Sequence, residues 1–301
     1  MSQNTQAKND AELNAIISES KKKAKNGTIV IVIGVVVMVL LFTFFSVVAV
    51  FAGIALIVIG MMMRSKAKSE IKECMTEAAL LPALNEVFDN VEYSAEDHIP
   101  DSIIKNTDMG FGFQMDRISG SDYIKAEYKG VGIEMSDITI KSIQTTTDSD
   151  GHVTQTEVTE FMGLWLICDF HKSFTADLRL TERQGIFNRF SKNSVETENE
   201  SFNKQFIIRS KNPHDVFYIL TPHMMEYIQE MDRKADARSY MLFEKSGKLY
   251  LALDSRRDAF EINSVSDANA EDLREQFIDE VHYVVDLIDE LRLVKTLHEV
   301  E

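Results

Sequence analysis

Apolar residues divide the chain into an N-terminal apolar run and a longer region of short alternating segments. The run extends from Thr28 to Met63, 36 residues without a charged side chain. As one α-helix it would be about 54 Å long, whereas the hydrocarbon core of a bilayer is about 30 Å thick. Two helices, Thr28–Phe44 and Val47–Met63, fit that thickness better than one overlong helix. The pattern therefore predicts a two-helix transmembrane hairpin.

Basic residues stand on both sides of this run and predict the orientation of the hairpin. They are Lys21, Lys22, Lys23 and Lys25 before the run, and Arg64, Lys66, Lys68 and Lys72 after it. Basic flanks are retained on the cytoplasmic side of a membrane, and only an even number of crossings places both there. We therefore expect a multi-pass membrane protein, with both termini and the soluble domain in the cytoplasm.

The part of the chain after the run is strongly acidic. The first 72 residues carry nine Lys and Arg against four Asp and Glu, a net charge of +5, so the remaining residues carry −21 of the total of −16. Nucleic-acid binding requires a basic face, and none is visible in this sequence. Cys74 and Cys168 are the two cysteines, and two widely separated thiols suit a reducing compartment.

Hydrophobic periodicity predicts an α+β fold for the soluble part, with a largely antiparallel sheet and flanking helices. The expected strands are Ser121–Tyr128, Gly132–Thr145, Val153–Asp169, Phe174–Thr181, Phe206–Ser210 and the hairpin "SYMLFEKSGKLYLAL". A helix is expected to start at Thr221-Pro222, and a last helix covers about Ala270 to Leu297.

The predicted organisation has four parts. A polar tail (1–27) precedes the hairpin (28–63), a helical connector interrupted at Pro82 follows (64–98), and the α+β domain occupies residues 99–301.

Several segments together resemble a bacterial membrane protein family known as domain of unknown function 3137. They are "ALLPALNEVFDNVEYS", "DRISGSDYIKAEYKGVGIEMSDI", "FMGLWLICDFHKSF", "FNKQFIIRSKNPHDVFYILTPHMMEYI" and "KLYLAL", after the apolar run. The resemblance implies a membrane topology and a bacterial source, so the expected location is the bacterial inner membrane. It implies no reaction, ligand or catalytic residue.

One segment, "TDSDGHVTQTE", partly matches a calcium-binding EF-hand loop. Asp148, Asp150 and Glu157 occupy ligand positions, but the first position is Thr146, and Thr-rich β-branched flanks disfavour the two helices that an EF-hand requires. Asp150-Gly151 between such flanks is typical of a hairpin turn. We therefore reject the calcium site. No zinc spacing, phosphate loop or nucleophile elbow occurs, so the sequence predicts no metal and no cofactor.

The last helix carries an apolar seam with the spacing of a helix that meets another helix. Its members are Phe277, Val281, Val284, Ile288 and Leu291. About two heptads are too few for a true coiled coil. The seam packs either onto its own domain or, alternatively, onto a protein partner or a second copy of the chain.

Two classes of function remain open at this point. The first is a membrane-anchored cytoplasmic interaction or scaffold module, whose acidic domain binds a basic or membrane-proximal protein. The alternative is a membrane-tethered enzyme, whose acid and base carboxylates come together only in the fold. Acyl, phosphoryl and metal chemistry usually leave a local motif, and their absence favours the interaction module.

Overall fold

The computed structural model describes most of the chain as two compact units, which we treat separately. The described residues are 3–42, 54–66, 80–147, 152–169, 175–183, 194–235, 237–256, 282, 284–286 and 288–289. One unit comprises residues 1–86 and 262–279, and the other comprises residues 87–261 and 280–301.

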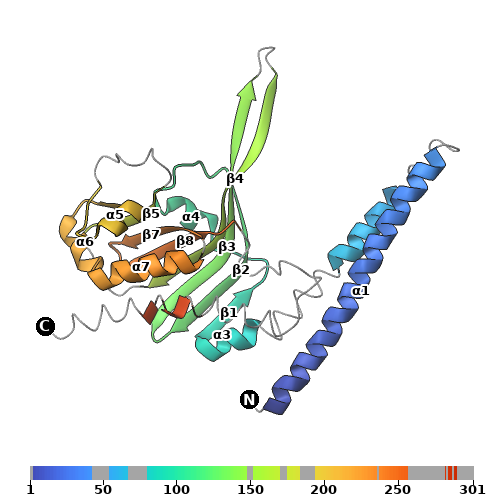
Figure 1. Cartoon of the computed structure of the whole chain (residues 1–301), viewed down its shortest axis with the longest axis horizontal. Coiled ribbons are helices and arrows are strands. Elements are labelled where there is room, and N and C mark those ends of the chain that lie inside the picture. Colours follow the sequence, from blue (N-terminus) through green and yellow to red (C-terminus); the bar gives the residue numbers. More distant parts are fainter. Residues whose placement is uncertain are drawn as a thin grey trace. The chain divides into compact units, whose positions relative to one another are not determined.

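The N-terminal unit contains two helices that lie side by side (Figure 1). Helix α1 spans Gln3–Phe42, and a shorter helix covers residues 54–66. The predicted polar tail is thus helical from Gln3, because nothing between residues 3 and 27 breaks a helix: that segment holds no proline and its one glycine is Gly27. Farther along, Pro82 is the second residue of α3 (Leu81–Val87), where its missing N–H costs nothing.

The second unit is built on a single eight-stranded antiparallel sheet. Its strands, in chain order, are β1 (Asp89–Ser94), β2 (Arg117–Tyr128), β3 (Val131–Thr147), β4 (Val153–Asp169), β5 (Leu178–Glu182), β6 (Phe206–Ser210), β7 (Arg238–Glu244) and β8 (Lys248–Asp254). The order in the sheet is β1-β2-β3-β4-β8-β7-β5-β6. The expected α+β class with an antiparallel sheet is confirmed. The connector, however, was predicted to be helical and contains edge strand β1.

Helices lie on both faces of the sheet. Those of the second unit are α4 (Asp101–Asn106), α5 (Glu200–Gln205), α6 (Pro213–Ile219) and α7 (Pro222–Ala235), and Figure 1 shows α5, α6 and α7 together on one side. Strands β7 and β8 are buried over nearly their whole length because both of their faces are covered.

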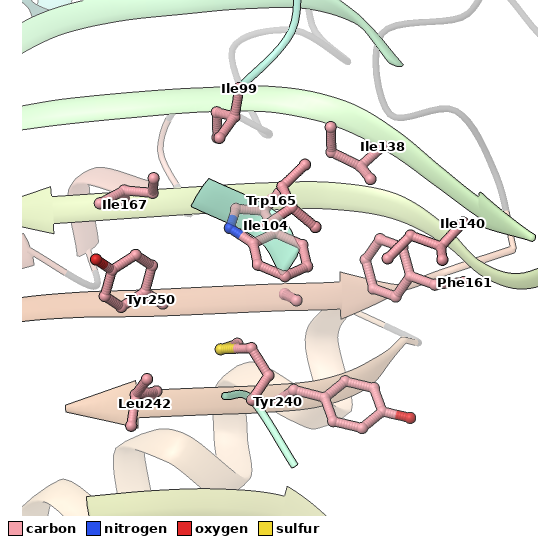
Figure 2. Packing of buried hydrophobic residues seen from close by; sticks show 12 residues of the cluster. Ile99, Ile104, Ile138, Ile140, Phe161, Trp165, Ile167, Tyr240, Leu242 and Tyr250 are labelled. Atoms are coloured by element: carbon pink, nitrogen blue, oxygen red, sulfur yellow. The ribbon is translucent and has the colours of Figure 1, made fainter. Parts of the chain in front are cut away.

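The core on the α4 face is aromatic and aliphatic. Its centre is Trp165 on β4, which is 0% exposed and contacts the rings of Phe111 and Phe161 at centroid distances of 5.8 and 6.0 Å. Figure 2 shows Ile99 and Ile104 lying over the sheet residues of this cluster, with Tyr240 and Leu242 beside them. The middle strands β3 and β4 supply Ile138, Ile140, Phe161 and Trp165. The long strands of the sheet therefore form the base of this core.

Local sequence determines several element ends as expected. The Thr221 hydroxyl accepts a hydrogen bond from Met224 N–H at 3.2 Å, so Thr221 caps α7 and Pro222 begins it. Lys245, Ser246 and Gly247 connect β7 to β8, and Gly247 takes the positive φ of 88° that this turn requires.

Candidate functional site

The two N-terminal helices meet at glycine. A Cβ atom on Gly27 would lie 2.9 Å from the Gly60 carbonyl oxygen and 3.2 Å from the Arg64 nitrogen. On Gly60 it would lie 2.8 Å from the Gly27 oxygen and 2.5 Å from Ile31. Residue numbers rise along one helix as they fall along the other, so the helices are antiparallel. Only glycine permits this close backbone approach.

Five positions of α1 that are buried or partly buried repeat at intervals of four and three residues. They are Ser20, Ala24, Gly27, Ile31 and Gly34, and Lys21 and Val30 beside them are also partly buried. Of the five, all but Ile31 are small, which is the composition by which helices approach closely inside membranes. This seam was missed in the sequence analysis, although its small residues at helical spacing were the signal that could have found it.

The outer surface of the same hairpin is apolar. Ten large apolar side chains are between 43% and 58% exposed there: Ile29, Val32, Ile33, Val35, Val36, Ile54, Val58, Ile59, Met61 and Met62. We call this set the apolar surface of the hairpin. Among the residues that the structure describes elsewhere, the exposed large hydrophobics are Val153, Phe217 and Tyr218. An apolar surface of this size on a soluble protein marks an interaction site.

Basic residues gather at one end of the hairpin. Gly27 lies against Arg64, so the antiparallel packing brings Lys25 and the lysines before it to the end where Arg64 and Lys66 lie. Lys68 and Lys72 lie outside the described residues. Across the described ranges, no single helix combines the length and the mean hydropathy that a membrane crossing requires.

The rejected calcium loop coincides with the end of a β-hairpin. Thr147 of β3 pairs with Val153 of β4, so the segment between them connects two antiparallel strands, while Asp148, Asp150 and Gly151 lie outside the described residues. Glu157 contacts two basic side chains, Arg117 at 2.5 Å and Lys141 at 3.3 Å. Its carboxylate therefore joins neighbouring strands of the sheet.

The C-terminal seam is described at two of its five predicted positions. Val284 and Ile288 are each 1% exposed, so these two side chains belong to the core and are not available to a partner. Asp289, the residue after Ile288, accepts hydrogen bonds from Tyr128 at 3.0 Å and Lys129 at 2.6 Å, and the bond that Lys129 donates to Asp289 raises the pKa of Lys129. Phe277, Val281 and Leu291 lie outside the described residues.

A pocket of about 190 Å³ opens beside the irregularity in β2. Its polar lining consists of Ser119, Ser121, Thr139 and Asp137, and Met162 contributes an apolar wall. Asp122 lies next to it and is completely buried, but its carboxylate oxygens accept hydrogen bonds from Tyr93 at 2.5 Å and Ser121 at 2.8 Å. Asp137 is the acidic residue in the lining of this pocket, whereas acid–base chemistry commonly needs a pair.

Other buried acidic groups are held by structural contacts. The Asp254 side chain is 2% exposed, accepts a hydrogen bond from Met162 N–H at 3.2 Å, and pairs with Arg256 at 3.2 Å and Arg238 at 3.6 Å. Asp232 accepts from Ser239 at 2.6 Å and Gln205 at 2.5 Å. These contacts join α7 and the β4–β8 pair to the rest of the sheet.

Cys168 has no reactive character. It is 1% exposed on β4, and burial, together with the charge of Asp169, raises the pKa of its thiol to about 12. A neutral buried thiol is neither a good nucleophile nor a metal ligand. Cys74 lies outside the described residues. No group of three or more potential metal ligands occurs within the described ranges.

The described features define a class of protein, an antiparallel α+β domain that shares its chain with a helical hairpin of apolar exterior. Residues 159–293 match the family described as "Protein of unknown function (DUF3137)". The family resemblance seen in the sequence is confirmed over this segment, which starts within β4 and does not include the hairpin. No curated protein and no solved structure matches the chain.

Proposed function

We propose that the chain is a membrane-anchored interaction module, in which the N-terminal hairpin inserts into a bilayer and the acidic α+β domain binds a protein partner. The observation that carries this proposal is the apolar surface of the hairpin. Its ten side chains are roughly half exposed, and transferring the exposed half of each to hydrocarbon is worth about 1 kcal/mol. The sum, about 10 kcal/mol, equals the whole stability of a typical domain.

The packing of the two helices also supports insertion. Close glycine contacts bring helices together in lipid, where apolar side chains gain nothing by meeting each other. The uncharged run of 36 residues supplies enough length for two crossings when its central residues, which the structure does not describe, are included.

The proposed orientation follows from the common basic end of the hairpin. That end carries Lys21, Lys22, Lys23 and Lys25 of one helix together with Arg64 and Lys66 of the other. Clustered lysine and arginine residues remain on the cytoplasmic side of a membrane. We therefore propose a bacterial inner-membrane location, with both termini and the α+β domain in the cytoplasm.

Alkaline carbonate extraction of the full chain from bacterial membranes tests the anchor. We expect the wild type to stay in the membrane pellet, and a Val32→Asp, Val58→Asp double variant to move to the supernatant. Val153→Asp is the matched control, because Val153 is also an exposed valine, at 62%, but lies on β4. Release of the wild type by carbonate would refute the anchor.

Cysteine labelling tests the orientation. Since Cys168 is buried, a reporter is needed, and Lys204 on α5 has a side chain that is 76% exposed. A Lys204→Cys reporter in a Cys74→Ala, Cys168→Ala chain should resist an impermeant maleimide in intact spheroplasts and react after lysis. Labelling of the intact cells would place the domain on the outer side.

The proposed partner has a basic surface. A net charge of −21 over the residues after the anchor attracts a basic protein and acts mainly on the rate of encounter. Confinement to the membrane raises the effective concentration, so a weak contact suffices. We expect in-cell cross-linking to recover reproducible membrane or membrane-proximal partners and capture to weaken in 1 M salt, where the Debye length is about 3 Å. Capture that salt does not change would contradict this mode of binding.

An enzyme remains the alternative, and the pocket around Asp137 is the observation that favours it. The pocket lining contains one acidic residue and three residues with hydroxyl groups, which is a composition suited to a small polar ligand. An Asp137→Asn variant separates the two proposals. If the protein is an interaction module, Asp137→Asn should leave both partner capture and the activity of the protein in the cell unchanged. If it is an enzyme, the variant should lose its activity in the cell although it still captures the partner.

A further inference from the structure

Two lysines continue an exposed apolar stripe along helix α1. Five exposed residues are spaced by three and four positions, so they share the helix face opposite the seam that meets the second helix: Lys22, Lys25, Ile29, Val32 and Val36. The three apolar side chains are 47%, 56% and 48% exposed. Lys25 lies about 6 Å along the helix axis from Ile29. This face therefore changes from apolar to cationic within about one helical turn.

The second helix of the hairpin repeats this arrangement. Ile59, Met62 and Lys66 are spaced by three and four residues and are all exposed, Ile59 at 49% and Met62 at 58%. Because the two helices are antiparallel, Lys66 lies at the same end of the hairpin as Lys25. Each helix thus presents an apolar stripe that ends in lysine, and both stripes end at the same end of the hairpin.

The positive charge at this end is not neutralised within the described residues. Lys22, Lys25 and Lys66 form no ion pair there, whereas Lys23 pairs with Glu19 at 3.6 Å. Residues 18–27 and 63–66 hold six basic residues and one acidic residue, a net charge of +5. Lysine stems can lie along an apolar surface while their ammonium groups stay in a polar layer. The three lysines are therefore available to an anion at the edge of the apolar stripes.

We propose that Lys22, Lys25 and Lys66 bind the phosphate headgroups of anionic phospholipids, whose acyl chains lie against the apolar stripes. This inference rests on the proposed membrane anchor and names the lipid that the anchor selects. An anionic phospholipid joins a phosphate to acyl chains, which matches a cationic group and an apolar stripe on one helix face. A zwitterionic phospholipid carries its own cation beside the phosphate and should bind more weakly. A soluble phosphate has no apolar part to cover the stripe.

Electron paramagnetic resonance of spin-labelled lipids tests this selectivity, with the full chain reconstituted in phosphatidylcholine vesicles. Lipids in contact with the hairpin are motionally restricted, and the restricted fraction gives the relative association constants of labelled phosphatidylglycerol and labelled phosphatidylcholine. We expect the wild type to prefer phosphatidylglycerol about fivefold, the effect of one basic residue near an anionic surface. The preference should decrease in 1 M salt, where the Debye length is about 3 Å.

A variant without the three lysines should lose the preference and keep the anchor. In Lys22→Gln, Lys25→Gln, Lys66→Gln we expect the two association constants to become equal within about twofold. The total restricted fraction in pure phosphatidylcholine should stay at the wild-type value, because the apolar stripes are unchanged. Retention of the wild-type preference in this variant would overturn the proposal.

The matched control removes the same charge from the α+β domain. Lys105→Gln, Lys204→Gln, Lys248→Gln replaces lysines whose side chains are 49%, 76% and 44% exposed, and it should keep the wild-type preference. The lipid proposal alone is refuted if the wild type restricts both lipids equally, or if this control loses as much preference as the hairpin variant. A wild type that restricts neither lipid would refute the anchor and the lipid proposal together.

Discussion

Gly27 and Gly60 contact each other through their backbones: each carbonyl oxygen lies within 2.9 Å of the position that a Cβ atom on the other residue would occupy. The contact is reciprocal, so either residue is enough to control the distance between the two helices.

A methyl group at Gly60 should separate the helices. Gly60→Ala places a carbon against the Gly27 oxygen and Ile31, and overpacking of this kind costs about 1–3 kcal/mol. Spin labels on Lys22 and Lys66, both exposed at the basic end, should give one narrow distance in the wild type and a longer, broader distribution in Gly60→Ala. Met61→Ala, at a neighbouring residue that is 58% exposed, should match the wild type. An unchanged distance in Gly60→Ala would contradict the helix contact.

The loss of stability in three glycine-to-alanine variants should depend on the space around each glycine. At Gly163, with φ +153°, a Cβ atom would lie 2.1 Å from the Leu253 oxygen, so alanine must disrupt the β4–β8 pair and cost about 3 kcal/mol or more. Gly130 has φ +77° but open space, so only backbone strain of about 1 kcal/mol applies. Gly112 has neither a close neighbour nor a positive φ, so Gly112→Ala should leave the stability unchanged. Chemical denaturation gives the three values, and equal losses would refute the close approach at Gly163.

A charge in the C-terminal helix distinguishes core packing from docking. Val284→Asp buries an unpaired carboxylate and should lower the free energy of unfolding by about 3 kcal/mol. His282→Asp adds the same group at an exposed position of that helix and should change stability by less than about 0.5 kcal/mol. Circular dichroism during thermal unfolding measures both. Full stability of Val284→Asp would show that the seam is free for a partner.

Asp215 should stabilise the domain in a pH-dependent manner. Burial alone would raise the pKa of Asp215, but hydrogen bonds from the Thr175 hydroxyl and the N–H groups of Thr175 and Ala176 outweigh it, so the pKa is lower than the ordinary 3.8. The ionised form is favoured by folding, and its contribution is present above pH 3.8 and disappears as the pH falls through the folded-state pKa.

Asp215→Ala should therefore cost about 1 kcal/mol at pH 7, and the difference from the wild type should shrink below pH 3.8. Urea titrations across this range measure the difference. Asp215→Asn keeps one acceptor oxygen and cannot ionise, so its stability should not follow that pH dependence. A gap between wild type and Asp215→Ala that stays constant down to pH 2 would contradict the mechanism.

Strong local patterns made much of the sheet predictable. The bounds Val153–Asp169 and Phe206–Ser210 agree with β4 and β6, because apolar runs with β-branched residues end there at charged or polar residues. Strand β1 was missed because "DNVEYS" is polar and pairs on one side only, at the edge of the sheet. Helices α5 and α6 have six and seven residues, too few to show helical periodicity.

The candidate sites were less predictable because their members are far apart in the chain. Gly27 and Gly60 meet only after the chain reverses. The seam of Val284 and Ile288 was visible as a pattern, but a pattern does not specify whether the surface it meets belongs to the same domain.

The hairpin of β3 and β4 extends beyond the other strands, as Figure 1 shows. The sheet therefore has two regions that differ in local stability. The register shifts between Ile140 and Lys141, and beyond it the residues from Gln144 to Thr147 on β3 and from Val153 to Glu157 on β4 are exposed. Seven residues of strand, Lys141–Thr147, reach about 24 Å. Amide protons in this arm should exchange with solvent through local opening, whereas those of Ile133–Ile140 should exchange only when the whole domain unfolds.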